Sequence, residues 1–331
     1  MSEQGSVSAP ATASERPESG LGSLLGAGVL AAGLYLSPRL APALFPLALV
    51  SPLPLAVLRL RSGGGGTVLA TVLAAALIAA VLTPGPAAWY LVVLAAPALL
   101  MAESLARGRG LLRGCGWAFA LLVAETAVGI LIAGASLAER MLAPLEHLRS
   151  EAFLNELKAG AVPPERLTAW TEQVGTLYDA LAVVFPAAYV IGGALLVLAN
   201  AALLRLYLVR RDPGWLEDGE FERVRWSLGL VGVFLVSGAA VALPAARPVA
   251  YNVLLVVAFF FALQGLAVVG FYARRLAGPP LLRVAVVVLV LANPWAPQIL
   301  ALLGLLDNWF DFRRWAEPSE SGDGTRPGGQ S

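Results

Sequence analysis

Long apolar runs alternate with short polar or glycine- and proline-rich breaks along most of the chain. Crossing a bilayer as an α-helix takes roughly 20 mostly apolar residues, and nine runs approach or exceed that length. They cover residues 21–36, 40–58, 67–83, 86–104, 112–136, 177–208, 226–244, 249–273 and 281–306. The pattern predicts an all-α, polytopic membrane helical bundle with eight or nine transmembrane helices. Residues 21–315 form its single transmembrane domain.

Prolines interrupt two of these runs. The second run contains Pro42, Pro46, Pro52 and Pro54. Proline at membrane depth is tolerated where neighbouring groups satisfy the freed backbone, so we expect a kinked or partly unwound helix there. The pair Asn293-Pro294 divides the last run into halves of about 12 residues, each too short to cross alone. A ninth span is slightly favoured over a re-entrant hairpin.

Polar segments lie at both ends of the chain and in its middle. Residues 1–20 and 316–331 are rich in Ser, Gly, Pro and Glu and are predicted to be disordered tails. Residues 138–176 repeat apolar and charged positions at helical spacing, and Pro163-Pro164 can start a second helix. Two short amphipathic helices are expected. They either lie on the membrane surface and cap the bundle or form a lid over an outward-facing cavity.

Arginines alternate between successive connections. Arg107, Arg109 and Arg113 follow the fourth run, and similar clusters follow the second, sixth and eighth, whereas the odd-numbered connections carry few. Basic residues in short loops stay on the cytoplasmic side. The pattern therefore predicts an inner (plasma) membrane protein whose N-terminus and even-numbered connections are cytoplasmic.

Composition narrows the function classes. The chain is 58% hydrophobic and 14% charged, against about 45–50% and about 25% in soluble domains. Its formal net charge of +1 gives no reason to expect a nucleic-acid partner. Cys115 and His147 are the only cysteine and histidine, which argues against a metal cluster or a nucleophile–base pair. No phosphate-binding G-x-x-x-x-G-K-[ST] sequence occurs. We predict no enzyme activity, no cofactor and no metal.

A few polar side chains fall inside the apolar runs. Glu125 lies mid-way along the fifth run, Asn200 in the sixth, and Gln264 and Asn252 in the eighth. Ionisable and polar groups are costly in hydrocarbon and usually face a bundle interior or a cavity. Two interpretations stay open. These residues either bind a small solute or proton near the membrane midplane, or hydrogen-bond to one another and fix helix packing.

The last run ends in a segment, 304–314, that alternates aromatic and charged residues. Aromatic residues of this kind anchor helices at the membrane interface. Alternatively, this segment binds a partner protein, and Asp307, Asp311 and Arg313 are then the candidate interface residues.

Several of these features together resemble the YybS-like bacterial membrane proteins, a family of unknown function. The resemblance rests on four segments: Phe45 to Pro54 leading into Leu58-Arg59, Phe185-Pro186 with Asn200, Gln264-Gly265, and Leu303 to Arg313. That family is similar to the S-components of energy-coupling-factor transporters. The similarity implies capture of a small solute and docking on an energy-coupling or other membrane subunit.

Two functions follow as hypotheses. The first is S-component-like binding or uptake of a small solute, in contact with the lipid bilayer and with Glu125, Asn200 and Gln264 as binding residues. The second is a scaffold or assembly factor that does not transport and binds another membrane protein.

Overall fold

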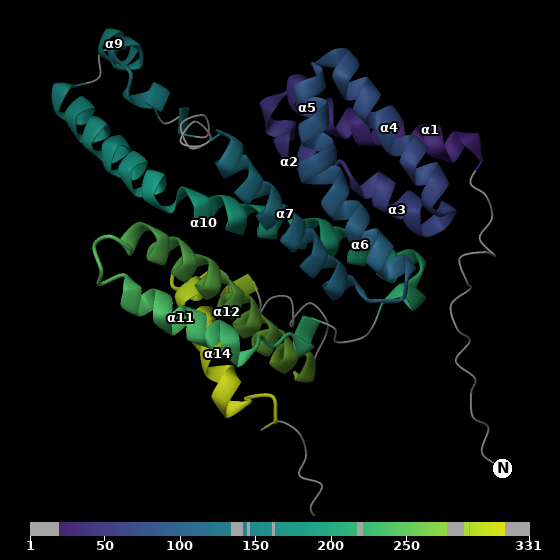
Figure 1. Cartoon of the computed structure of the whole chain (residues 1–331). Helices are drawn as coiled ribbons and strands as arrows, with labels where there is room; N and C mark the ends of the chain where they lie inside the picture. The colour runs from purple at the N-terminus through teal and green to yellow at the C-terminus, as the bar shows by residue number, and fades with distance from the viewer. Residues whose placement is uncertain are drawn as a thin grey trace, which may run out of the picture. The chain divides into compact units, whose positions relative to one another are not determined.

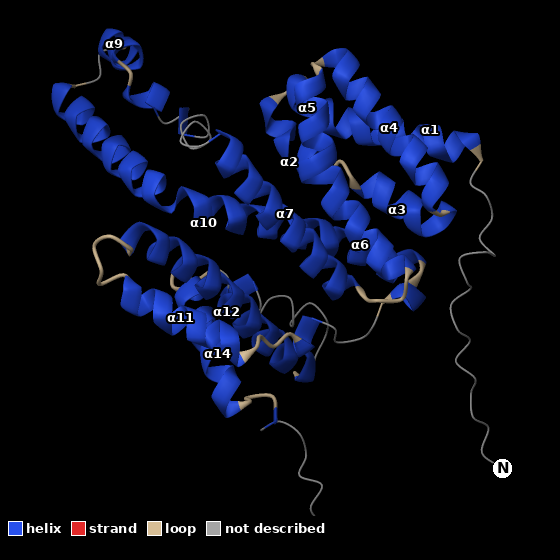
Figure 2. Ribbon diagram, in the orientation of Figure 1, coloured by secondary structure: helices blue, strands red, loops and turns tan. Residues whose placement is uncertain are grey.

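The computed structural model describes residues 20–133, 142–143, 146–160, 163–216, 221–276, 288–290 and 292–314. Every regular element in these ranges is helical (Figure 2). Seven described helices are long and apolar enough to cross a membrane, and Leu228–Ala240 is a shorter apolar helix. The all-α, polytopic prediction is confirmed. Apart from Gly20, the two predicted tails lie outside the described residues.

The chain forms two compact units, residues 1–218 and 219–331. The helices of the first unit are α1 (Leu21–Leu36), α2 (Phe45–Leu49), α3 (Leu53–Ser62), α4 (Gly64–Val81), α5 (Pro84–Trp89), α6 (Ala96–Ala106), α7 (Leu111–Ala133), α9 (Glu151–Ala159) and α10 (Pro164–Arg211) (Figure 1). Two short 3-10 turns, η2 (Ser37–Arg39) and η3 (Pro42–Leu44), lie between α1 and α2, and a third, η5 (Pro213–Trp215), follows α10. A π-helix, η4 (Tyr90–Ala95), connects α5 to α6.

The second apolar run is broken, as its prolines predict. Helix α2 ends at Leu49, and α3 begins at Leu53 directly after Pro52. Proline has no amide hydrogen and cannot continue the ladder of a preceding helix. The Ser51 hydroxyl, fully buried in the break, donates to the Ala48 carbonyl at 2.7 Å.

The second expected amphipathic helix is not a separate element. Residues from Pro164 onward run without interruption into the sixth span, which makes α10 a single helix of 48 residues. The change from an amphipathic to an apolar pattern therefore marks a change of surroundings along one helix. Pro186 lies inside α10 without ending it. Of the first expected amphipathic helix, residues 138–141 and 144–145 lie outside the described residues.

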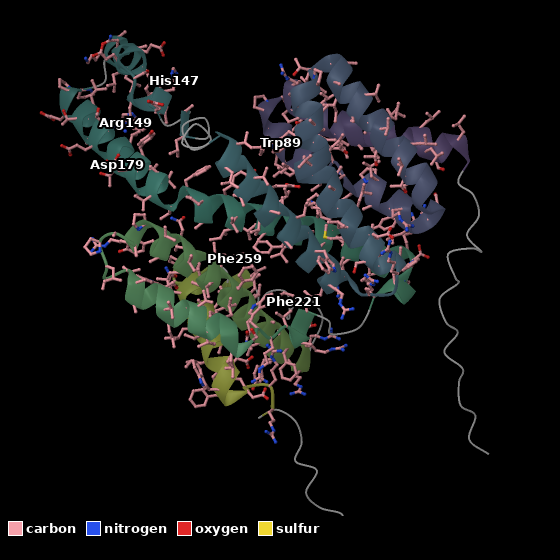
Figure 3. The ribbon with its side chains drawn as sticks, in the orientation of Figure 1. Trp89, His147, Arg149, Asp179, Phe221 and Phe259 are labelled. Atoms are coloured by element: carbon pink, nitrogen blue, oxygen red, sulfur yellow. The ribbon has the colours of Figure 1, made fainter. Side chains whose placement is uncertain are left out.

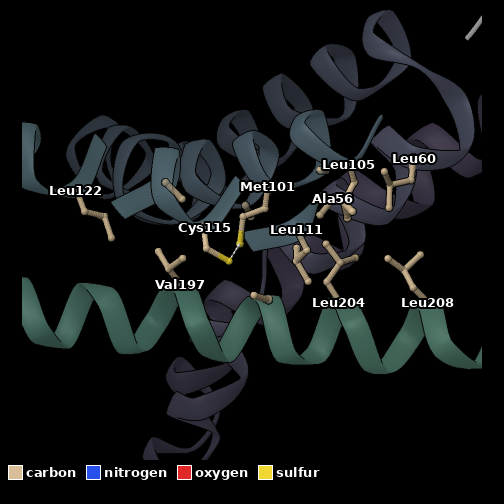
Figure 4. Packing of buried hydrophobic residues seen from close by; sticks show 14 residues of the cluster. Ala56, Leu60, Met101, Leu105, Leu111, Cys115, Leu122, Val197, Leu204 and Leu208 are labelled. Atoms are coloured by element: carbon tan, nitrogen blue, oxygen red, sulfur yellow. Dashed lines mark hydrogen bonds between the residues drawn. The ribbon is translucent and has the colours of Figure 1, made fainter. Parts of the chain in front are cut away.

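Two apolar clusters hold the first unit together. One joins α3, α6, α7 and α10 through side chains such as Met101, Leu122 and Leu204 (Figure 4). The Cys115 thiol in this cluster lies 3.8 Å from the Met101 sulfur. The other joins α1, α3, α4, α5 and η4 and includes the fully buried Tyr90.

The second unit contains η6 (Phe221–Arg223), α11 (Leu228–Ala240), α12 (Arg247–Arg275) and α14 (Ala296–Phe310). Helices α12 and α14 approach closely at two glycines. A Cβ on Gly265 would overlap the Leu300 carbonyl, and one on Gly304 would overlap the Phe261 carbonyl. Small residues allow this kind of close backbone approach between membrane helices.

The predicted break in the last run is confirmed, because turns occupy 292–295 and α14 starts at Ala296. The Trp295 amide donates to the Asn293 side-chain oxygen at 2.8 Å. Residues 277–287 lie outside the described residues. The choice between a ninth span and a hairpin therefore stays a prediction.

Candidate functional site

A cavity of about 700 Å³ lies in the first unit among α2, α5, η4, α7 and α10. Trp89, labelled in Figure 3, lines it from the end of α5. The remaining lining residues are Phe45, Pro46, Leu49, Val50, Val93, Leu122, Thr126, Ala188, Tyr189, Val190, Gly192, Gly193, Leu195, Leu196 and Ala199. The walls are thus largely hydrocarbon. The Thr126 hydroxyl is engaged by the Leu122 carbonyl at 2.7 Å.

Glu125 lies in α7 next to this cavity, because Leu122, one helical turn before it, and Thr126, directly after it, are lining residues. The residue is half-buried, but both of its carboxylate oxygens are buried and accept no hydrogen bond within the described part of the chain. Tyr189 of α10, which lines the cavity, lies within electrostatic range of this carboxylate. A buried carboxylate without a partner is costly. A cation, a proton or a hydrogen-bond donor that reaches the carboxylate offsets this cost in free energy.

Asn200 is buried, with 3% of its surface exposed. Its amide nitrogen donates to the Leu49 carbonyl at 3.1 Å and to the Leu196 carbonyl at 3.0 Å. The first bond caps the end of α2 at the break in the second span. The Asn200 side-chain oxygen accepts no hydrogen bond in the described residues. A void of about 10 Å³, also lined by Pro97, adjoins it.

Gln264 belongs to the second unit and is fully buried. Its oxygen accepts from the Trp226 backbone amide at 2.9 Å, and its nitrogen donates to the Asp307 carboxylate at 3.0 Å. Asn252 makes a local bond, donating to the Pro248 carbonyl at 2.7 Å. The burial expected for Asn200 and Gln264 is therefore confirmed, and each engages other parts of its own unit.

The three candidate interface residues also bind within their own unit. Asp307 is fully buried and accepts from Arg313 at 3.2 Å and from the Phe312 amide at 3.2 Å. Arg313 additionally donates to the Val224 carbonyl at 2.7 Å. Asp311, at a left-handed backbone angle of φ 44°, pairs with Arg225 at 3.1 Å. This network ties the segment after α14 to the segment before α11.

The sequence did not indicate that two other residues belong to these sites. Arg225 stands in the sequence as one of a cluster of loop arginines, and Trp226 as the start of a span. Their partners lie 86 and 38 residues away. The residues that line the cavity could not be predicted from the sequence either, because they come from apolar runs with similar composition.

The chain matches a protein family described as "Predicted membrane protein (DUF2232)" over residues 29–308. It belongs to this family. No curated protein and no solved structure matches the chain. Membership establishes a multi-pass membrane protein from a family of unknown function. The finer resemblance to YybS-like proteins and to S-components stays a prediction.

Proposed function

We propose that this family member binds a small, largely apolar solute in the cavity of the first unit, and that Glu125 selects solutes carrying a positive or hydrogen-bond-donating group. The observation that carries the proposal is an apolar cavity of about 700 Å³ beside a buried carboxylate with no described partner. Small-molecule sites are typically cavities of about 300–1,000 Å³ with apolar walls and a few polar groups.

The elements around the cavity support this assignment. The broken second span borders it through Leu49, and the π-helix η4 borders it through Val93. Interrupted membrane helices and π-helical turns both recur at binding sites. The predicted similarity to S-components adds an uptake role, in which the loaded cavity is presented to an energy-coupling subunit.

The test compares an apolar amine with its uncharged counterpart. We expect 1-naphthylmethylamine to raise the melting temperature of the purified full-length protein more than 1-naphthylmethanol does, since a ligand stabilises the state that binds it. Glu125→Gln should abolish the difference between the two compounds. Glu165→Gln, which changes an exposed carboxylate at the start of α10, is the matched control and should keep it. Equal stabilisation of the wild type by both compounds would contradict the role of Glu125.

A second candidate function is a scaffold that binds another membrane protein. Its support is the length of α10, because 48 residues at 1.5 Å each extend about 72 Å, against about 30 Å of hydrocarbon. Near its start, Trp170 donates to the Leu148 carbonyl at 3.5 Å. The guanidinium of Arg149, a residue labelled in Figure 3, lies 4.9 Å from the centre of the Tyr178 ring. Replacing residues 146–176 by a short Gly-Ser linker should remove a stably bound partner while solute-induced stabilisation persists. Loss of solute binding instead would assign residues 146–176 to the cavity.

A further inference from the structure

Three connections of the first unit meet at one end of its helices. Leu60, Leu105, Leu111 and Leu208 belong to a single buried cluster (Figure 4). This cluster packs the end of α3, the end of α6, the start of α7 and the end of α10 against one another. The Arg61 guanidinium lies 5.5 Å from the centre of the Tyr207 ring, which joins α3 to α10 at the same level.

Arginines concentrate at this end. We call it the arginine end and define it by eight residues: Arg59, Arg61, Arg107, Arg109, Arg113, Arg205, Arg210 and Arg211. They come from segments up to about 150 residues apart along the chain, so the fold gathers into one surface what the sequence shows as three separate clusters. Most of them, including Arg61, Arg113 and Arg211, are exposed.

Acidic groups do not balance this charge. Both carboxylate oxygens of Glu103 are paired within this end: one accepts from Arg59 at 2.6 Å and the other from Arg107 at 2.7 Å. Asp212 is the other carboxylate in the described residues of this end. Eight arginines against two carboxylates leave the described part of this surface strongly positive.

Short connections hold the arginines at the level of the helix ends. Gly63 alone separates α3 from α4, with φ 80°, and Gly108 and Gly110 turn the α6–α7 connection with φ 65° and 81°. Left-handed angles of this kind suit glycine, which has no Cβ. Tyr207 and Trp215 pack against the cluster beneath this surface, and such aromatic residues mark the headgroup level of a bilayer.

We propose that the arginine end binds the phosphate groups of anionic phospholipids, engaging several head groups at once. A guanidinium matches a phosphate with paired hydrogen bonds, and each arginine near an anionic leaflet strengthens binding about fivefold. An arginine excess in separate loops is sufficient to orient a membrane protein. A compact, multivalent surface at headgroup depth additionally gives preference for one lipid class. This site is independent of the cavity proposed above.

The experiment uses the full-length protein in a neutral detergent. Phosphatidylglycerol or phosphatidylcholine is added, and retained lipids are counted by native mass spectrometry alongside the melting temperature. We expect phosphatidylglycerol to be retained at least tenfold more strongly. Arg61→Gln/Arg113→Gln should weaken its retention roughly 25-fold by the same rule. Arg61→Lys/Arg113→Lys keeps the charge but loses the paired hydrogen bonds of the guanidinium, so it should restore part of the retention.

The control variant is Arg39→Gln/Arg166→Gln. It removes two exposed arginines of the same unit that lie away from this surface, after α1 and at the start of α10. It should leave the preference for phosphatidylglycerol unchanged. Equal retention of both lipids, or equal losses in the two Gln variants, would overturn the proposal. So would displacement of bound lipid by millimolar glycerol phosphate, which would indicate a site for a soluble phosphate compound.

Discussion

Gln264 donates its side-chain amide to the Asp307 carboxylate at 3.0 Å, and both side chains are fully buried. The same carboxylate oxygen accepts from Arg313 at 3.2 Å. A charge buried at this depth persists where it is paired and hydrogen-bonded. The pair therefore links α12 to α14, and Arg313 extends the link to the segment after α14.

Removing the charge of Asp307 should destabilise the second unit. In Asp307→Asn, the new amide turns a donor either toward Gln264 and Arg313 or toward the Phe312 amide, and it leaves the largely buried Arg313 guanidinium without its counter-ion. Breaking a buried pair in this way costs about 3–5 kcal/mol, so the melting temperature in detergent should fall clearly. Asp311→Asn breaks a more exposed pair with Arg225 and should cost about 0–1 kcal/mol. Similar melting temperatures for both variants would contradict a structural role for the Asp307 pair.

The sequence predicted the helical runs because apolar length is a direct requirement of the bilayer. It also predicted that Asn200 and Gln264 would be buried, since exposing them to lipid is costly. It did not predict their partners. Periodicity says which face of a helix is polar, but Leu49 is 151 residues from Asn200, and only the packing of the whole unit brings them together. The continuity of α10 was missed for a related reason, because a change in hydropathy at Leu177 reports surroundings rather than a helix end.

The close crossing of α12 and α14 should be intolerant of larger side chains. A Cβ in Gly304→Ala would overlap the Phe261 carbonyl, and neither helix backbone can move without disturbing the other contacts. Overpacking typically costs about 1–3 kcal/mol. Gly238→Ala is the control, because its Cβ would meet open space. Thermal unfolding in detergent should separate the two variants, and an unchanged midpoint for Gly304→Ala would argue against the tight crossing.

The arginine alternation predicts the topology. On a Cys115→Ala background, which removes the chain's only cysteine, we expect Arg109→Cys to be protected from an impermeant thiol reagent in intact cells. Gly160→Cys should react, because residues 138–176 form the fifth connection, and the alternation places odd-numbered connections outside. Both positions are exposed in the structure, so burial does not explain a lack of labelling. Labelling of Arg109→Cys but not of Gly160→Cys would reverse the predicted orientation.

Asn200 should stabilise the break in the second span. Its amide supplies a hydrogen-bond donor to the Leu49 carbonyl, the last residue of α2, and the bilayer offers no water to replace it. Asn200→Leu preserves the approximate volume but removes the donor, and leaving a buried carbonyl unpaired costs about 1–3 kcal/mol. Thr71→Val is a suitable control, because the Thr71 hydroxyl bonds to the Thr67 carbonyl of its own helix turn, and this carbonyl keeps its backbone partner in the variant. We therefore expect a lower melting temperature for Asn200→Leu and little change for Thr71→Val.

The α2 end also lines the proposed solute cavity through Leu49, so Asn200→Leu should weaken stabilisation by 1-naphthylmethylamine as well. A variant that unfolds earlier yet responds fully to the amine would confine Asn200 to the helix break and leave the cavity to Glu125.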